Sequence, residues 1–415
     1  MYIRLIQFKS LALLLRYEEI INLAPEINLP ASKSISNRAL IIQALSEVHI
    51  PLSNLSKASD TEILINVIKE NSLSKNIGIA GTAARFLCAY LATKKSDSIL
   101  DGDQRMRERP MNTLFYALSQ LGAKIEFVDK AGFLPVKING EHTQGGEINI
   151  DSSVSSQFVS ALMLIAPRLN KGLKIKLDGA ISSSKYIEMT KHILGYFNID
   201  VYVDKSHIII PHQEFTAIPL TIESDWSSAS YFYSALALVE QGEIVLKNLK
   251  FDSWQGDEIV ADIFYRLGIS STMQGDDVRL EKTNHMVDYL VYDFIECPDL
   301  AQTVICTCVG LGIEGEFKGL HTLVHKETNR IKALQNELKK LKWILEESST
   351  GIFHLKRDHT PKELNLNIHT YNDHRMAMAF APLAIVYDKL SIDHAEVVKK
   401  SFPSFWEEFS KLGLS

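Results

Sequence analysis

One pattern recurs six times along this chain: a run of small polar residues leads directly into an apolar stretch that favours a helix. In the first copy, Ser32, Ser34 and Ser36 precede an alanine- and leucine-rich segment. A serine hydroxyl there can accept a hydrogen bond from a free N–H in the first helical turn. After the first two copies, successive starts lie about 70 residues apart, which suits a small βαβ-type unit better than a solenoid repeat. The copies begin near residues 32, 80, 152, 224, 298 and 371.

The segments between these copies have the character of strands and of further helices. Alternating or β-branched residues predict strands at 147–150, 173–177, 207–210, 243–246 and 364–368. Second helices are predicted at 109–121, 186–197, 257–267 and 329–341, and Gly122, Gly195 and Gly268 fit helix ends or the turns beyond them. The sequence therefore predicts a mixed α/β fold built as three units plus three.

The chain is too long for one ordinary hydrophobic core, since 415 residues exceed the usual size of a single domain. The best boundaries are the loop before Ser32 and the segment 222–224, where a strand-like run meets the fourth copy. We therefore predict one domain from residues 31–223 and another from residues 1–30 plus 224–415. Two chain crossings would join them, which makes a hinge plausible.

Composition excludes several classes of function. The chain is 46% apolar with a net charge of −6, so it offers no overall basic surface for nucleic acid or for a membrane. The apolar run at 11–15 is too short to span a membrane. The cysteines at 88, 297, 306 and 308 lack zinc-type spacing and are typical of reduced, buried thiols. We expect a soluble, cytoplasmic protein.

Cations stand at two of the expected helix starts, where the helix dipole disfavours them. Lys33 and Arg38 open the first copy, and Arg375 opens the sixth. This arrangement makes sense if an anion binds there, although a capped surface helix with solvated charges is the simpler reading of any single motif. Asp299, at the start of the fifth copy, is either a cap or a catalytic acid–base group.

Two further basic stretches are candidates for the same kind of site. Arg109 directly precedes Pro110, at an expected helix start. Lys326 and Arg330 are four residues apart and share a face if they lie on one helix. Glu327 lies beside that face and suits acid–base work if its pKa is shifted. A salt-bridged surface helix is the alternative for this second stretch.

Ten motifs together resemble the 5-enolpyruvylshikimate-3-phosphate synthase family, and they occur in the family's order over nearly the whole chain. They are Leu-Pro-Ala-Ser-Lys-Ser-Ile-Ser-Asn-Arg at 29–38, Ala-Gly-Thr-Ala-Ala-Arg at 80–85, Met-Arg-Glu-Arg-Pro at 106–110, Ser-Ser-Gln-Phe at 155–158, Asp-Trp-Ser-Ser-Ala-Ser-Tyr at 225–231, Gln-Gly-Asp at 255–257, Pro-Asp at 298–299, His-Lys-Glu-Thr-Asn-Arg at 325–330, Tyr-Asn-Asp-His-Arg-Met-Ala at 371–377 and Lys-Ser-Phe-Pro at 400–403.

The resemblance implies a fold and a reaction. The fold is two similar domains, each of three βαβαββ units around a pseudo-threefold axis, an inside-out α/β barrel. The reaction moves the enolpyruvyl group of phosphoenolpyruvate to the 5-hydroxyl of shikimate 3-phosphate and releases phosphate by addition and elimination. It serves the shikimate pathway to chorismate and the aromatic amino acids, with no metal or cofactor, and we expect a monomer whose partners are these two small molecules.

The resemblance also implies roles for individual residues. Asp299 would take the hydroxyl proton and Glu327 would protonate the methylene carbon, with Lys326 and Lys33 in support. The shikimate 3-phosphate site would comprise Lys33, Ser34, Arg38, Ser155, Ser156, Gln157, Ser183, Asp299, Thr322 and Lys326. The phosphoenolpyruvate site would comprise Lys33, Gly81, Arg109, Gln157, Arg330, Arg375 and Lys400.

Some positions depart from the usual family pattern: Ile79, Lys185, Thr322 and Asn329. None of them replaces the proposed acid, base or main cations. Gly81 is kept, as in the glyphosate-sensitive branch of the family, so we expect inhibition by glyphosate.

Two alternatives remain open at this point. UDP-N-acetylglucosamine enolpyruvyl transferases share the fold but use a loop cysteine, and none of the four cysteines here lies in a matching loop motif. The other alternative is a catalytically silent sugar-phosphate-binding relative, which would bind ligand without turnover.

Overall fold

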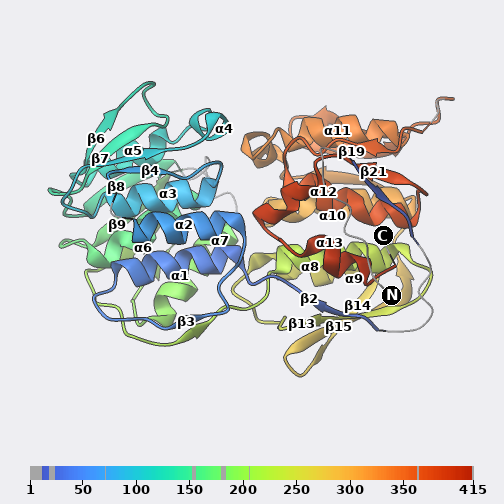
Figure 1. The fold of residues 1–415 in the computed structure, drawn as a ribbon, viewed down its shortest axis with the longest axis horizontal. Coiled ribbons are helices and arrows are strands. Elements are labelled where there is room, and N and C mark those ends of the chain that lie inside the picture. Colours follow the sequence, from blue (N-terminus) through green and yellow to red (C-terminus); the bar gives the residue numbers. More distant parts are fainter. Residues whose placement is uncertain are drawn as a thin grey trace.

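The computed structural model describes residues 12–17, 24–70, 72–151, 156–178, 184–204, 206–361 and 364–413, without the side chain of His325. Ser155 and Ser183, both predicted site residues, lie outside the described residues. The buried apolar side chains form two separate clusters. One extends from Ala31 to Ile222, and the other combines Leu15 and Ile27 with side chains from Trp226 to Phe409. Figure 1 shows the two parts of the chain that contain these clusters side by side, and we call these parts the N-terminal lobe and the C-terminal lobe.

Four sheets repeat one topology, in which two parallel strands are followed by two antiparallel ones. In the N-terminal lobe these sheets are β4 (Ser74–Asn76), β5 (Ser98–Asp101), β7 (Val136–Asn139) and β6 (Lys124–Phe127), and β8 (Gly146–Asp151), β9 (Leu173–Asp178), β11 (His207–Ile210) and β10 (Tyr202–Val203). In the C-terminal lobe they are β2 (Glu26–Asn28), β13 (Glu243–Lys247), β15 (Asp277–Met286) and β14 (Leu267–Gln274), and β16 (Tyr289–Asp293), β17 (Glu314–Lys318), β19 (Ile352–Arg357) and β18 (Trp343–Ser349).

The two remaining sheets are smaller, and each joins strands that lie far apart in the sequence. In the C-terminal lobe, β20 (Asn367–Ile368) pairs in parallel with β21 (Leu390–Ile392), and β1 (Leu13–Leu15) adds to its other edge. In the N-terminal lobe, β3 (Leu52–Ser53) pairs with β12 (Leu220–Thr221). Since β2 pairs with β13, two early strands belong to the C-terminal lobe.

The two chain crossings between the lobes lie side by side. Ala31 and Ser224 form an antiparallel bridge. Ser32 N donates to the carbonyl of Glu223 at 2.8 Å, and Asp225 N donates to that of Pro30 at 2.9 Å. The chain thus leaves and re-enters the C-terminal lobe at one place.

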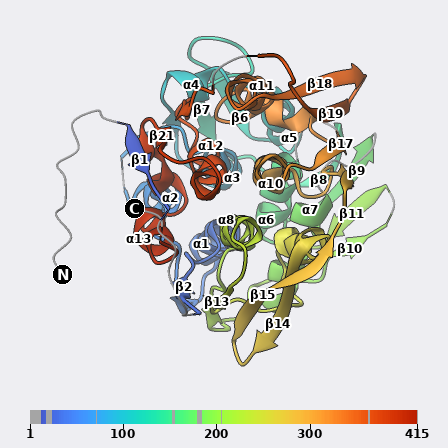
Figure 2. The same ribbon diagram turned by 90° about the vertical axis from the view of Figure 1, so that its right-hand side faces the viewer.

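Three helices fill the centre of each lobe. They are α1 (Lys33–Leu45), α3 (Gly81–Leu91) and α6 (Ser156–Ile165) in one lobe, and α8 (Trp226–Leu238), α10 (Ala301–Leu311) and α12 (His374–Phe380) in the other. Figure 2 shows α8, α10 and α12 close to end-on, with the sheets outside them. These helices are apolar or small on nearly all faces, as a helix enclosed on every side must be. Their six starts match the six recurring motifs.

The remaining helices lie around this centre. They are α2 (Ser59–Lys69), α4 (Gln104–Arg107), α5 (Asn112–Gln120), α7 (Ser184–Tyr196), α9 (Val260–Tyr265), α11 (Arg330–Lys340) and α13 (Phe405–Ser410), with 3-10 turns η1 (Ala166–Arg168), η2 (Gly256–Ile259), η3 (Pro298–Leu300), η4 (His321–His325), η5 (Ala381–Ile385) and η6 (Ala395–Lys400). Four of these helices, α5, α7, α9 and α11, fall within the predicted second-helix segments to within a few residues at each end.

Two local predictions are wrong. Gly195 does not end its helix, because α7 continues to Tyr196 and the left-handed turn falls on Asn198, at φ 61°. The run at 364–368 is paired only at its last two residues. Gly122, by contrast, has a φ of 104° just beyond α5, as predicted. Gly268 also has a positive φ, 88°, but it lies inside β14, three residues after α9 ends. No helix in the described ranges is both long and apolar enough to cross a membrane.

Candidate active site between the lobes

Several of the predicted site residues lie at the N-terminal ends of the central helices. Ser32 caps α1 by accepting from Ile35 N at 3.4 Å, and Lys33 and Ser34 follow it. Asp373 caps α12 by accepting from Arg375 N at 2.9 Å. At the starts of the other helices stand Gly81 on α3, Ser156 and Gln157 on α6, Ser227 on α8 and Asp299 just before α10. Free N–H groups at these ends favour bound anions.

The Asp299 carboxylate lies inside a ring of cations. Its Oδ1 is 3.2 Å from Arg330 Nη1 and 3.5 Å from Lys326 Nζ, and its Oδ2 is 3.0 Å from Arg375 Nη2. The Tyr186 hydroxyl, from the N-terminal lobe, donates to the same Oδ2 at 3.1 Å. Asp299 is therefore in contact with both lobes.

Glu327 has a second set of cationic partners. Lys400 Nζ lies 2.7 Å from its Oε1, and Arg330 Nη2 lies 2.8 Å from its Oε2. Arg330 also pairs with the fully buried Asp373, at 2.7 Å. This one arginine, only 2% exposed, thus links Asp299, Glu327 and Asp373.

Charge governs the protonation of both carboxylates. Burial by itself would raise the pKa of Asp299, but Arg375, Lys326 and Arg330 outweigh it and hold the pKa well below the usual range. For Glu327, burial is likewise outweighed by Lys400, Arg330 and Arg109, and its pKa is also well below normal. Without ligand, both groups are ionised.

The basic side chains respond to the same environment. Burial lowers the pKa of Lys326, and Asp299 offsets only part of that shift. The pKa of Arg330 is raised, because Asp373, Glu327 and Asp299 outweigh its burial. Lys326 therefore suits a role in sharing a proton better than Arg330 does.

The prediction that Lys326 and Arg330 share a helix face is wrong. Arg330 is the first residue of α11, whereas Lys326 follows η4 in extended conformation. Both side chains nevertheless reach Asp299 Oδ1. The two side chains meet at Asp299 although they do not lie on one helix, because the chain bends between residues 326 and 330.

Arg109 is placed for an anion from the N-terminal lobe. It is 9% exposed, and its Nε is buried without a hydrogen-bond partner among the described residues. Burial lowers the pKa of Arg109, while Glu327 across the lobes raises it. A Cβ at Gly81 would come within 2.4 Å of Arg109 Nη1, so a larger residue there would displace this guanidinium.

The residues predicted to bind shikimate 3-phosphate differ from one another in their partners and burial. Lys33 Nζ pairs with Asp60 at 3.2 Å. Gln157 Nε2 donates to Thr82 Oγ1 at 3.2 Å. Arg38 is 1% exposed and bonds protein groups: its Nε donates to Thr190 Oγ1 at 2.8 Å, and burial lowers its pKa to about 10. In this structure Arg38 therefore joins α1 to α7 within the N-terminal lobe.

Each departure from the family pattern has a defined place in the structure. Asn329 caps α11, accepting from Lys332 N at 3.1 Å. The carbonyl of Ile79 lies 3.5 Å from Lys400 Nζ. Thr322 Oγ1 is buried without a hydrogen-bond partner in the described part of the chain. Lys185 Nζ pairs with Glu188 at 2.8 Å.

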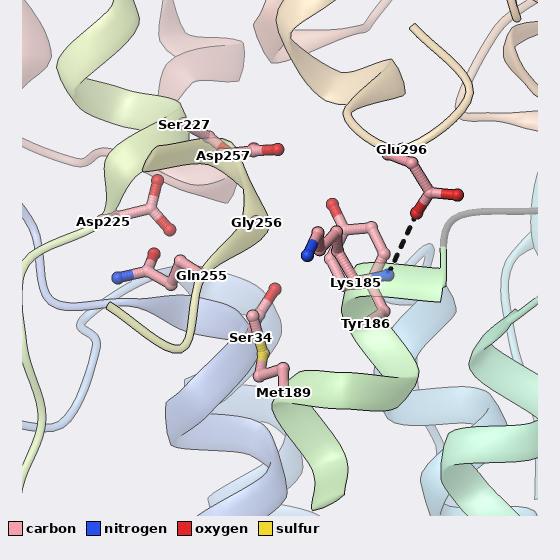
Figure 3. Close-up of a pocket in the computed structure, with 10 residues that line it drawn as sticks. All are labelled: Ser34, Lys185, Tyr186, Met189, Asp225, Ser227, Gln255, Gly256, Asp257 and Glu296. Carbon is pink, nitrogen blue, oxygen red and sulfur yellow. Dashed lines mark hydrogen bonds between the residues drawn. The ribbon is translucent and has the colours of Figure 1, made fainter. Parts of the chain in front are cut away.

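A pocket between the lobes contains groups to which we had assigned no role. Figure 3 shows Ser34 and Tyr186 on one side, and Ser227 and Asp257 on the other. The Ser227 hydroxyl donates to Asp257, and burial, followed by the charge of Asp299, raises the pKa of Asp257 to about 7. The Gln-Gly-Asp motif marked this residue, but the motif gave no sign that the carboxyl is buried.

Glu296 forms a further contact across the lobes. The Ser184 hydroxyl and the Lys185 N–H, at the start of α7, both donate to Glu296 Oε2, at 2.7 Å and 3.2 Å. Figure 3 shows this carboxylate opposite the start of the helix. It thereby caps a helix of the other lobe.

Metal ligation finds no support in the described ranges. They contain no group of three or more His, Cys, Asp or Glu side chains placed to hold an ion. All four cysteines are buried and unpaired, and burial raises the pKa of each thiol.

Comparison with known proteins gives a consistent result. The family model described as EPSP synthase (3-phosphoshikimate 1-carboxyvinyltransferase) matches residues 64–409. The 3-phosphoshikimate 1-carboxyvinyltransferase of Bacteroides fragilis strain YCH46 is 43% identical over 388 residues, covering 93% of this chain and 95% of the relative. That of Histophilus somni strain 2336 is 33% identical over 419 residues, covering 93% and 96%.

Solved structures show the same fold. An EPSP synthase from Acinetobacter baumannii has a TM-score of 0.74 at 19% identity, covering 97% of this chain and all of that one. The enolpyruvyl transferase NikO from Streptomyces tendae has a TM-score of 0.71 at 10% identity, covering 98% of both chains. The predicted fold class is thereby confirmed.

Proposed function

We propose that this chain, which belongs to the EPSP synthase family, transfers the enolpyruvyl group of phosphoenolpyruvate to the 5-hydroxyl of shikimate 3-phosphate and releases phosphate. The observation that carries the proposal is the pairing of two buried carboxylates, Asp299 and Glu327, each held by cations at the junction of two lobes. Both substrates are polyanions, and such a site supplies the compensating charge.

The cations divide the site between the two substrates. We assign Arg330, Arg375 and Lys400 from one lobe, with Arg109 and Gly81 from the other, to phosphoenolpyruvate. Lys33, Ser34 and Gln157, backed by Arg38, would hold shikimate 3-phosphate. Ser156, Thr322 and Lys326 would complete that second site, together with Ser155 and Ser183, which lie outside the described residues.

The chemistry assigns a separate task to each carboxylate. Asp299 would accept the proton of the 5-hydroxyl as its oxygen attacks C2 of phosphoenolpyruvate, while Glu327 would deliver a proton to C3. The resulting tetrahedral intermediate would then return a proton from C3 to the Glu327 carboxylate as the bond from C2 to phosphate breaks and phosphate leaves. Lys326 and Lys33 would stabilise the charge that develops on the reacting groups.

A carboxyl group with a very low pKa holds no proton to donate at neutral pH, and substrate binding would resolve this difficulty. The cations that depress the pKa of Glu327 are Lys400, Arg330 and Arg109, which we also assign to phosphoenolpyruvate. When substrate oxygens pair with these cations, the cations stabilise the Glu327 carboxylate less, and the pKa of Glu327 rises. Glu327 can then take up the proton that it must deliver.

The first test measures phosphate release with each substrate alone and with both together, for the wild type and for Asp299→Asn. We expect release only with both substrates, reduced about 100- to 10,000-fold in the variant. The exposed Asp288→Asn is a matched control and should keep full activity. Release with UDP-N-acetylglucosamine as acceptor would overturn the assignment, and binding without release would identify a silent relative.

The proposed function also predicts how the enzyme responds to glyphosate. Glyphosate should inhibit competitively with phosphoenolpyruvate, and full activity at millimolar glyphosate would contradict this expectation.

Both parts of the site come from one chain, so we propose that the enzyme acts as a monomer. Four buried free thiols suit a reducing compartment, and we propose the cytoplasm.

A further inference from the structure

Arg105 makes a contact across the lobes that none of the assigned roles explains. It lies on α4 in the N-terminal lobe, four residues before Arg109. Its Nε donates to the carbonyl of Glu327 at 3.0 Å, and its Nη2 donates to that of Lys326 at 3.2 Å. Its Nη1 lies 3.2 Å from the carboxylate of Glu108 on its own lobe.

The segment that Arg105 contacts has little other backbone support. Lys326 and Glu327 lie between η4 and α11, outside regular secondary structure. Neither of their carbonyls accepts a hydrogen bond from another backbone N–H of the described residues. A planar guanidinium with two donors on neighbouring carbonyls fixes the direction of this peptide more firmly than one bond would.

We propose that Arg105 is a positioning residue that sets Lys326 and Glu327 for proton transfer when the two lobes meet. This proposal rests on the function proposed above and deepens it. The contact joins the proton-transfer groups of one lobe to the loop that carries Arg109 in the other. The same contact that fixes the peptide of Glu327 therefore also brings the loop of Arg109 close to it.

Arg107 supplies a matched control on the same short helix. Its side chain is 40% exposed, against 42% for Arg105. It pairs with Asp101, at 2.6 Å, and so stays within its own lobe. Loss of either arginine removes the same charge from the same surface, but only Arg105 reaches the other lobe.

The experiment compares Arg105→Ala, Arg105→Lys and Arg107→Ala in the full-length protein. Steady-state kinetics give kcat and KM for both substrates, and hydrogen exchange is followed at the backbone amides of residues 324–330. Millimolar guanidinium is added to each alanine variant, with sodium chloride at equal ionic strength as the control. Thermal unfolding verifies that each variant is folded.

We expect Arg105→Ala to lower kcat about 10- to 100-fold, as small displacements of reacting groups do, with KM changed less than about threefold. Exchange at 324–330 should become faster, and guanidinium should restore part of kcat. Arg105→Lys should stay impaired, because an ammonium cannot hold two carbonyls in one plane. Arg107→Ala should match the wild type in kinetics and exchange.

Equal behaviour of Arg105→Ala and Arg107→Ala would overturn the proposal, as would a fall in kcat without faster exchange. Faster exchange without a fall in kcat would also overturn it. If the wild type released no phosphate, the proposed function would fail, and the exchange comparison would still decide whether Arg105 holds this segment.

Discussion

At the scale of single residues, Asp257 is a buried carboxyl group whose burial opposes its ionisation. It is 6% exposed, and the only hydrogen bond that its carboxylate accepts from the described residues comes from Ser227. Its pKa is raised from 3.8 to about 7, first by burial and then by Asp299. The folded protein therefore binds a proton here that the unfolded chain has already lost between about pH 4 and pH 7.

The sign of the resulting pH effect is fixed. The stabilising contribution of Asp257 is fully present below about pH 4 and is lost as the pH rises to about 7. We expect Asp257→Asn to raise the free energy of unfolding by about 2 to 4 kcal/mol at pH 8 and to leave it nearly unchanged near pH 4. Urea denaturation across this range measures the difference, with the exposed Asp252→Asn as control. A difference independent of pH would contradict the expectation.

Gly81 limits the position of Arg109. A Cβ at Gly81 would lie 2.4 Å from Arg109 Nη1 and 2.8 Å from Arg85 Nη1, so Gly81→Ala must displace at least one guanidinium. We expect the KM for phosphoenolpyruvate to rise about tenfold, the cost of about 1.4 kcal/mol of lost binding, with little change for shikimate 3-phosphate. Gly195→Ala, whose Cβ meets nothing within 4 Å, is the control. An unchanged KM would mean that Arg109 does not bind phosphoenolpyruvate.

The proposed release of Glu327 from its cations predicts proton uptake. Phosphoenolpyruvate should raise the pKa of Glu327 on binding to the complex with shikimate 3-phosphate, so protein and substrate together should take up protons near neutral pH. Calorimetric titration in two buffers with different ionisation enthalpies measures the number of protons. The Glu327→Gln variant should show less uptake, and equal uptake in both proteins would place the titrating group elsewhere.

At the scale of elements, the start of α11 depends on Asn329. This residue satisfies Lys332 N at the position directly before Arg330. We expect Asn329→Ala to lower the free energy of unfolding by about 1 kcal/mol, the usual value of such a cap. Asn329→Asp keeps the acceptor and should remain close to the wild type. Chemical denaturation compares the three proteins, and equal stability of the alanine variant would show that the cap contributes nothing.

The elements also show what a sequence can and cannot predict. The six central helices were predictable because a polar cap and an enclosed apolar helix both leave a pattern in the residues. Strands of two residues, such as β3, β10 and β12, are too short for any alternation to be visible. The prediction that a helix ends at Gly195 is wrong because glycine is also tolerated inside a helix. Only the packing decides whether a helix ends at a glycine or continues through it.

At the scale of the whole molecule, the predicted domain boundaries can be tested directly. All of the apolar cluster of the N-terminal lobe comes from residues 31–222. We expect the segment 31–223, produced alone, to unfold cooperatively in urea. The segment 31–216, which lacks β12 and so leaves β3 unpaired, should be less stable. Failure of 31–223 to show a cooperative transition would mean that the lobes are not independent domains.

The site itself was predictable only in part. Motifs identified the charged residues, because the chemistry of two polyanions demands them. They did not indicate which groups meet across the lobes, and so Arg105 and Glu296 were not assigned roles. The contacts of these two residues join positions more than a hundred apart, and only the placement of the lobes creates them.

The two adjacent chain crossings have a consequence for synthesis on the ribosome. The β2 strand is made early, yet its partner β13 emerges more than two hundred residues later, roughly 10 to 40 seconds at ordinary translation rates. During that interval the N-terminal lobe is complete enough to fold, whereas β2 has no sheet to join. A strand that is synthesised first thus pairs with one that is synthesised much later. A chaperone that shields β2 would act in that interval.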